Sequence, residues 1–94
     1  MTDGISSLWH ELTGQVVVLD MVSSFVCIGR LAEHQGDFLR LDDADVHDLR
    51  DTTSTRDQYV LKCRLHGHMP NRQQAWLSLR EVVGISRLAD VIVD

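Results

Sequence analysis

The spacing of apolar residues predicts a helix at the start of the chain. Apolar residues at positions i, i+3, i+4 and i+7 form one face of an amphipathic helix, and four residues have this spacing: Ile5, Leu8, Trp9 and Leu12. Asp3 precedes them as a candidate N-cap, and Gly14 follows them, where a helix commonly ends in the left-handed conformation. We therefore expect about two turns of helix here.

The pattern then changes to β-branched runs without a helical period, which predicts strands over 15–21 and 25–31. Successive strand residues point to opposite faces. One face of the first strand holds Val17, Leu19 and Met21, and the other holds Val16 and Val18. One face of the second strand holds Phe25, Cys27 and Leu31, and the other holds Val26 and Ile28. A turn at 35–37 then leads into a third strand that opens with 38–41.

Gly29 lies inside the second predicted strand. A glycine in a strand interior often marks a sharp bend or the close approach of another backbone, and we expect one of these here. Several predicted strands are apolar on both faces, whereas a small barrel buries only its inner face. The outer face therefore needs a covering helix or a neighbouring subunit.

The second half of the chain predicts an inserted helix. Ser54, with Asp57 three residues later, resembles a capping box at its start. A helix that ends near Gly67 would bury a stripe formed by Tyr59, Val60 and Cys63. Alternating apolar residues then predict a fourth strand over 75–79 and a fifth over 82–85. The apolar tail, 88–93, is either a short strand or a docking segment.

Length and composition favour one globular domain that spans residues 1–94. The formal net charge is −5, because 9 Lys and Arg residues face 14 Asp and Glu residues. General coating of nucleic acid depends on clustered Lys and Arg, so this charge argues against it. A local basic site is still compatible with the sequence, because the distribution of charge matters as well as its sum.

The order of the predicted elements and four short motifs resemble the Sm-like (LSm/Hfq-type) family of small barrels. The matching motifs are Leu12-x-Gly14, Gly29-Arg30-Leu31, Leu39-Arg40-Leu41-Asp42-Asp43-Ala44 and, more approximately, Leu79-Arg80-Glu81. The resemblance implies a mainly β fold, namely a strongly bent five-stranded antiparallel barrel. A helix precedes the barrel, and a second helix is inserted between strands 3 and 4.

The resemblance also implies a function. Family members form rings in which strand 4 of one subunit pairs with strand 5 of the next, and many of these rings bind uridine-rich RNA. The corresponding contacts in this chain are Asp37, Phe38 and Arg80. The turn before the third strand is about one residue shorter than in the family, so Phe38 or Leu39 takes the place of an Asn that binds the base. Glu81 also replaces the Gly of the second motif, and the uridine pocket is therefore altered.

Two functions remain open at this point. The first is a ring that binds short or single-stranded RNA, in which Phe38 stacks on a base and Arg80 contacts the RNA. The second is an acidic homo-oligomeric scaffold ring that engages a protein partner and no nucleic acid. In the simpler structural reading Arg80 pairs with Glu81 or with an acid of a neighbouring subunit, and Phe38 belongs to the core.

Other polar residues have a structural reading beside a functional one. In the acidic stretch 42–48, Asp45, His47 and Asp48 are candidate metal ligands or an acid/base pair, and on a strand Asp45 and His47 would share one face while Asp48 points away. In the structural reading, Asp45 and Asp48 bond nearby backbone groups in a turn or pair with an Arg of a neighbour. His66 and His68 either interact favourably with the dipole at the end of the inserted helix or form a metal site in the loop. A last group forms a lateral basic surface or a solvated helix face: Arg56, Lys62, Arg64 and Arg72.

The sequence gives little support for catalysis. No Gly-rich phosphate loop is present, and Ser23, Ser24 and Ser54 lack the context of a nucleophile. Cys63 lies between Lys62 and Arg64, but a buried helix thiol is the simpler reading. We expect a protein that is not an enzyme and has no cofactor.

The location that the sequence favours is the cytoplasm. Cys27 and Cys63 have the apolar surroundings of free core thiols. The chain has no apolar run of about 18 residues, and its start lacks a basic segment followed by an apolar one. We therefore expect no membrane partner.

Overall fold

The computed structural model describes residues 3–93, with side chains from residue 7 onward. Helix α1 (Asp3–Leu12) is followed by five strands and a second helix, α2 (Arg56–His66), which lies between the third and fourth strands. The strands are β1 (Val16–Met21), β2 (Phe25–Gln35), β3 (Phe38–Asp48), β4 (Arg72–Ser78) and β5 (Val82–Arg87). Three short 3₁₀ turns follow β3, β4 and β5, at Leu49–Asp51, Leu79–Glu81 and Leu88–Asp90.

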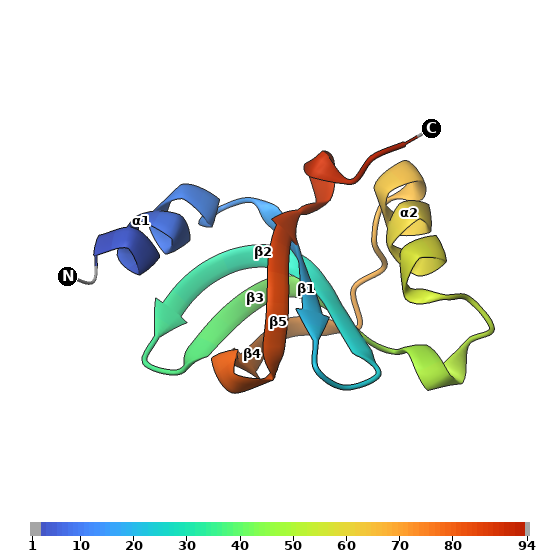
Figure 1. Ribbon diagram of the computed structural model, residues 1–94, viewed down its shortest axis with the longest axis horizontal. Coiled ribbons are helices and arrows are strands. Elements are labelled where there is room, and N and C mark those ends of the chain that lie inside the picture. The colour runs from blue at the N-terminus through green and yellow to red at the C-terminus, as the bar shows by residue number, and fades with distance from the viewer. Residues whose placement is uncertain (1–2, 94) are drawn as a thin grey trace.

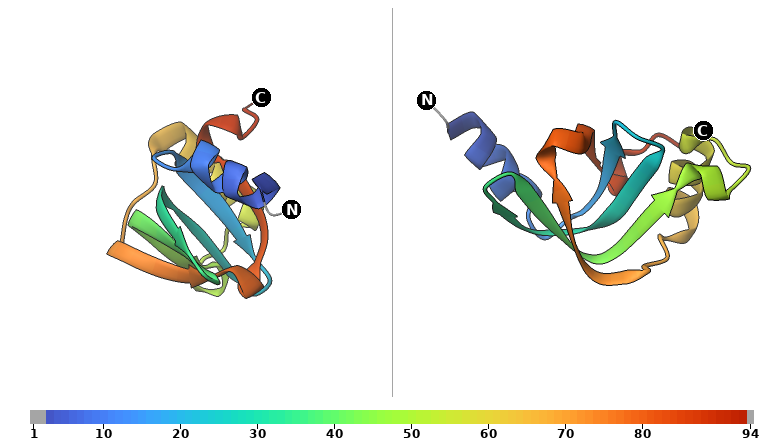
Figure 2. Two further views of the ribbon diagram at one scale, coloured as in Figure 1. Left: turned by 90° about the vertical axis from the view of Figure 1, so that its left-hand side faces the viewer. Right: turned by 90° about the horizontal axis from the view of Figure 1, so that it is seen from below.

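The five strands form one antiparallel sheet in the order β4-β3-β2-β1-β5. The long strands β2 and β3 curve strongly, and β5 crosses over them, so that the sheet curls into an open barrel (Figures 1 and 2). The strands β4 and β5 are the two edges of this sheet. The predicted fold is therefore confirmed: a strongly bent five-stranded antiparallel barrel with a leading helix and a helix inserted between strands 3 and 4.

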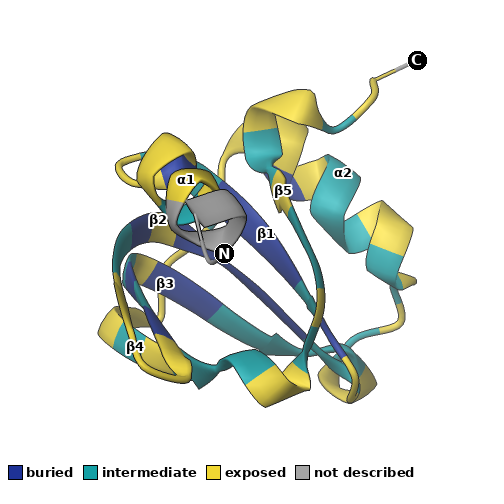
Figure 3. Cartoon of the chain, turned by 60° about the vertical axis from the view of Figure 1, so that its left-hand side comes forward, coloured by how far each residue is buried: buried dark blue, intermediate teal, exposed yellow. Residues whose placement is uncertain are grey.

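The inner face of the curled sheet holds the larger core. Strands β1, β2 and β3 carry most of its buried residues, as Figure 3 shows in dark blue. This core consists of Leu12, Val17, Leu19, Met21, Cys27, Leu31, Leu39, Leu41 and Ala44. Apolar residues of the two edge strands pack against it as well, namely Ala75, Leu77, Val82 and Ile85. Of the residues predicted to share these faces of β1 and β2, Phe25 alone is outside this buried set, and it packs against it.

The outer face of the sheet is covered by α2. A second buried cluster consists of Val18, Val26, Ile28 and Cys63, with Val16, Tyr59 and Val60 packed against it. The two-sided apolar pattern of the first strands is thus explained within one chain, because α2 buries their outer residues. The apolar tail docks on the same cluster through Leu88 and Val91, in a 3₁₀ turn rather than a strand.

Gly29 lies at a close approach between β2 and β3. A Cβ at this position would lie 3.0 Å from the Cα of Ala44 and 3.0 Å from the carbonyl oxygen of Asp42. The register between the two strands also shifts between Ile28 and Arg30, which indicates a bulge. The expected close backbone approach is therefore present, at the point where the long strands bend.

The predicted ends of the second and fourth strands were wrong. β2 does not end at Leu31 but continues to Gln35, and β3, for which only the opening at 38–41 was predicted, continues through the acidic stretch to Asp48. The acidic stretch can form a strand because its alternate residues Ala44 and Val46 face the inner core. Leu79 begins a 3₁₀ turn instead of ending β4, although its side chain still packs on the inner core.

The inserted helix begins one residue later than the proposed capping box. Its N-cap is Thr55, whose hydroxyl accepts a hydrogen bond from the backbone N–H of Gln58 at 3.1 Å. The amide oxygen of Gln58 accepts in turn from the backbone N–H of Thr55 at 2.9 Å. A Gln side chain is long enough for this return bond, whereas an Asp side chain is one methylene shorter. The helix ends at Gly67, whose φ of 85° is in the left-handed range.

The end of α1 also agrees with its prediction, since Gly14 has a φ of 88°. The side chains of Asp3, the expected N-cap, and of Ile5 lie outside the described residues. Within residues 3–93, neither helix has the length and apolar character that crossing a bilayer requires.

A substitution at Gly29 tests the origin of the bend. We expect Gly29→Ala to lower the free energy of unfolding by about 1–3 kcal/mol, because the added methyl group meets backbone atoms that cannot move aside. Gly84→Ala is the matched control, since its Cβ would come no closer than 3.8 Å to Asp20. Urea unfolding at one fixed protein concentration measures both, and equal stabilities of the two variants would contradict the prediction.

Candidate nucleic-acid interface

The three residues that the sequence analysis selected lie in two turns at the same end of the sheet. Asp37 and Phe38 stand where β2 turns into β3, and Arg80 stands in the 3₁₀ turn between β4 and β5. The backbone N–H of Leu79 donates to the carbonyl of Asp37 at 2.7 Å, and Phe38 is paired with Ser78 across β3 and β4. The two turns are therefore held side by side by main-chain contacts.

Local sequence explains the shape of each turn. Gly36 has a φ of 57°, a conformation that a glycine adopts without steric cost, and this lets β2 reverse directly into β3. Ser78 caps the second turn, because its hydroxyl accepts from the backbone N–H of Arg80 at 3.2 Å. The backbone of Arg80 is thus fixed while its side chain extends into solvent.

The side chains of Arg80 and Asp37 form an ion pair. Nη2 of Arg80 lies 3.6 Å from Oδ2 of Asp37, and the two side chains are 82% and 66% exposed. In the structural reading of the sequence, Arg80 pairs with Glu81 or with an acid of a neighbour, whereas within the described residues its partner is Asp37. An ion pair this exposed stabilises the fold by about 0–1 kcal/mol at most, so a ligand can displace it.

Phe38 is the aromatic group of this site. It is 47% exposed, so it does not belong to the buried core as its simpler reading held. An exposed ring at the start of a strand offers a flat surface on which a base can stack. Together the two turns present an aromatic face, a guanidinium and a carboxylate to solvent.

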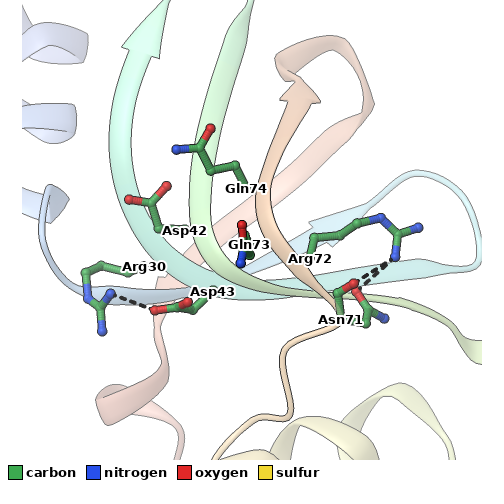
Figure 4. Close-up of a pocket in the computed structure, with 7 residues that line it drawn as sticks. All are labelled: Arg30, Asp42, Asp43, Asn71, Arg72, Gln73 and Gln74. Atoms are coloured by element: carbon green, nitrogen blue, oxygen red, sulfur yellow. Dashed lines mark hydrogen bonds and ion pairs between the residues drawn. The ribbon is translucent and has the colours of Figure 1, made fainter.

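A second polar surface, which the sequence analysis did not find, lies beside β4 (Figure 4). It is an open hollow of about 660 Å³ lined by Arg30, Asp42, Asp43, Asn71, Arg72, Gln73 and Gln74. Much of its lining is engaged within the chain. Arg30 pairs with Asp43 at 3.1 Å, and the side chain of Asn71 bonds both backbone groups of Val46. Its one signal in the sequence is the polar run 71–74, which begins an edge strand.

The proposed lateral basic surface is only partly present. Arg56 points back to the sheet, where its guanidinium donates to the carbonyls of Phe25 and Ser23 and lies 3.7 Å from Asp20. It therefore anchors α2 and is not part of that surface. Lys62, Arg64 and Arg72 are exposed, as a solvated helix face and its neighbourhood would be.

The proposed metal residues of β3 have structural partners. Asp45 is 3% exposed and accepts a hydrogen bond from the Tyr59 hydroxyl of α2, and His47 stacks on the Tyr59 ring with 3.9 Å between centroids. Asp45 and His47 do face α2 together, as a strand requires. Asp48 points away, and Ser24 donates to it at 2.8 Å. Within residues 3–93, no three His, Cys, Asp or Glu side chains are grouped as metal ligands.

The same contacts shift the pKa values of Tyr59 and Asp48. Burial and the hydrogen bond to Asp45 raise the pKa of the Tyr59 hydroxyl well above its usual range. Hydrogen bonds from the side chain and backbone of Arg50 hold the pKa of Asp48 well below its usual range. Asp48 thus caps the turn after β3 as a carboxylate that accepts from the backbone N–H of Arg50.

The two cysteines and the two histidines near the end of α2 also have structural environments. Burial raises the pKa of the Cys27 thiol to about 11, and burial also raises the pKa of Cys63 despite its two basic neighbours in the sequence. Both are free, buried thiols. His66 lies exposed in the last turn of α2, and a ring nitrogen of His68 lies 2.8 Å from the carbonyl oxygen of Asp43.

Removing the Tyr59 hydroxyl tests the junction between α2 and β3. We expect Tyr59→Phe to lower the free energy of unfolding by about 2 kcal/mol, because it leaves the buried Asp45 without this donor. Urea unfolding measures the loss. Asp45→Ala combined with Tyr59→Phe should cost less than the sum of the two single changes, and strict additivity would show that the two groups do not interact.

Comparison with known proteins gives structural neighbours only. No protein-family model and no curated protein matches this sequence. A solved Sm protein of Pyrococcus abyssii, in complex with a uridine heptamer, is similar with a TM-score of 0.59 and 15% identity, over 87% of this chain and 94% of that one. The P. aerophilum SmAP1 heptamer is similar with a TM-score of 0.59 and 17% identity, over 93% of each chain.

A heptameric archaeal Sm protein is also similar, with a TM-score of 0.57 and 17% identity, over 86% of this chain and 96% of that one. All three neighbours have the same architecture along nearly their whole length. At identities this low, the structural similarity shows a common fold and does not identify the ligand. The chain therefore has the Sm-like fold that its sequence motifs predicted.

Proposed function

We propose that this chain is a non-catalytic, ring-forming protein that binds short or single-stranded RNA through Asp37, Phe38 and Arg80. The observation that carries the proposal is the meeting of these three residues at one end of the sheet. They come from two turns that are 42 residues apart in the sequence, counting from Phe38 to Arg80, and that share the hydrogen bond between Leu79 and Asp37. An exposed aromatic ring in one turn and a guanidinium in the adjoining turn suit a stacked base and its phosphate.

The structural neighbours support both parts of the proposal. Two of them are heptamers, and the Pyrococcus abyssii protein was solved with a uridine heptamer. Their fold is thus compatible with ring assembly and with RNA as a ligand. For this chain, the RNA would be held by an altered pocket. Phe38 brings no hydrogen-bonding group to a base, and Glu81 adds a negative charge beside Arg80.

The ring would close by pairing β4 of one copy with β5 of the next. Both strands are edges of the sheet, so each has a row of backbone groups without a strand partner in the single chain. Val83 on β5 is 71% exposed, and Trp76 on β4 is exposed as well. An edge strand with exposed apolar side chains favours pairing with another chain, and head-to-tail pairing that closes gives a cyclic ring.

The charge distribution favours the second candidate, an acidic scaffold ring that engages a protein partner. Each copy carries a formal charge of −5, which a ring multiplies. Six of its arginines form ion pairs with acids of the same chain: Arg30, Arg40, Arg50, Arg56, Arg80 and Arg87. A long RNA would therefore be repelled over most of this surface, and binding must be local.

A lysine on the β5 edge tests ring assembly. We expect Val83→Lys to shift the protein from the ring towards single chains of 10.7 kDa, because a charge on an edge strand opposes pairing. Val22→Lys is the matched control, since Val22 is 67% exposed but lies in the turn between β1 and β2. Size-exclusion chromatography with light scattering gives the masses. A wild-type protein that elutes as a single chain would contradict the ring.

Replacing Arg80 tests the RNA site. We expect Arg80→Ala to weaken binding of a labelled single-stranded RNA roughly tenfold at low salt, through the loss of a charged contact to phosphate. Fluorescence anisotropy of the purified oligomer measures the affinity. Binding should also weaken as salt rises, less steeply for Arg80→Ala than for the wild type.

The control for this experiment is Arg64→Ala, which removes an exposed arginine of α2 and leaves the two turns intact. Equal losses in the two variants would indicate non-specific charge attraction. No binding by the wild type at tens of micromolar protein would overturn the RNA function and favour the scaffold.

A further inference from the structure

We infer that the Asp37 carboxylate gives the proposed site a preference for guanine over uracil. This inference rests on the proposed function, because it concerns the base that the same three residues hold. It follows from the position of Asp37, which precedes the exposed Phe38 in the chain and lies 3.6 Å from the guanidinium of Arg80. Phe38 stacks on any base and Arg80 is assigned to the phosphate, so the base edge is left to Asp37.

The three groups divide the recognition of a nucleotide between them. A ring such as Phe38 stacks on any base, because every base has a flat face, so stacking sets affinity and little selectivity. Arg80, with its positive charge, is attracted to the phosphate that all nucleotides share. Asp37 is then the group at this site that can read a base edge, since its side chain is 66% exposed and lies at the same turn as Phe38.

An ionised carboxylate only accepts hydrogen bonds, so it selects bases by the donors on their edges. Guanine presents two adjacent donors, N1–H and the N2 amino group, which match the two oxygens of a carboxylate. Cytosine and adenine each present one amino group, at N4 and N6. Uracil presents a single N3–H between two carbonyl oxygens, and these oxygens face a carboxylate unfavourably. The order of preference is therefore guanine first and uracil last.

The ion pair with Arg80 is compatible with this role. Arg80 approaches Oδ2 of Asp37 at 3.6 Å, beyond the usual length of a hydrogen bond. A carboxylate has about four lone-pair sites, so it can accept from a base while Arg80 remains near one oxygen. The guanidinium also offsets the repulsion between the Asp37 carboxylate and the RNA phosphates.

The experiment compares hexamer RNAs that differ in the base at alternate positions, and guanosine differs from inosine only in the N2 amino group. Fluorescence anisotropy at low salt measures binding of the full-length oligomer to alternating uridine–guanosine, alternating uridine–inosine and oligo-uridine. We expect the guanosine hexamer to bind about tenfold more tightly than oligo-uridine, the effect of one two-bonded base contact. Inosine lacks the N2 amino group but keeps N1–H, so most of this gain should be lost with the inosine hexamer.

Asp37→Asn provides the decisive variant. An Asn side chain both donates and accepts, so the variant should bind oligo-uridine more tightly and lose the tenfold preference for guanosine. Asp51→Asn is the matched control, because it removes the same charge from an exposed residue in the 3₁₀ turn after β3. This control should leave the guanosine preference unchanged.

The outcomes separate the inference from the function on which it rests. If the wild type binds the hexamers without preferring guanosine, or if Asp37→Asn retains that preference, the inference is wrong and RNA binding stands. If neither the wild type nor the Asp37→Asn variant binds any hexamer, the proposed RNA function is wrong and the base preference falls with it.

Discussion

At Gly29 the backbone of β2 passes so close to β3 that a side chain there would lie 3.0 Å from the Cα of Ala44. The rest of the structure depends on this contact. It lies where the two longest strands bend, and the bend turns an open sheet into a curled one that encloses its own inner face (Figure 2). Residues of β4 and β5, at opposite edges of the sheet, can then pack on the same core.

The second constraint is the cover over the outer face of the sheet. Val18, Val26 and Ile28 would face solvent if α2 were absent, and their burial is what holds the helix against β1 and β2. The hydrogen bond from Tyr59 to the buried Asp45 and the contacts of Arg56 with the carbonyls of Phe25 and Ser23 fix the position of the helix. With its outer face covered in this way, the sheet presents its two edge strands for association.

The proposed functions of this molecule depend on the groups that the curled sheet leaves exposed. The edges β4 and β5 are available for pairing, and the two turns at one end present Asp37, Phe38 and Arg80. The surrounding surface is acidic, and its arginines are largely engaged with acids of the same chain. Such a surface discourages general attraction of phosphates, so the proposed RNA recognition would depend on the few groups at the turns.

The fold and the candidate site residues were predictable from the amino-acid sequence. The apolar pattern indicated which residues share a face of each strand, because side chains in a strand point to opposite faces in turn. The positions of Gly14, Gly29 and Gly67 marked two helix ends and the bend, since these backbone conformations or contacts exclude a side chain or strain it. Motifs in the two turns then indicated Asp37, Phe38 and Arg80.

Tertiary structure decided which partner each polar group has. Asp45 and His47 had the residue types of metal ligands, but Tyr59 of α2 contacts both, and no local pattern predicts that a distant helix supplies this partner. Three further features likewise depend on segments far apart in the sequence. They are the extension of β3 through an acidic run, the pairing of Arg80 with Asp37 and the hollow beside β4. Local periodicity reports which residues are buried, whereas the partner of a charge is set by long-range packing.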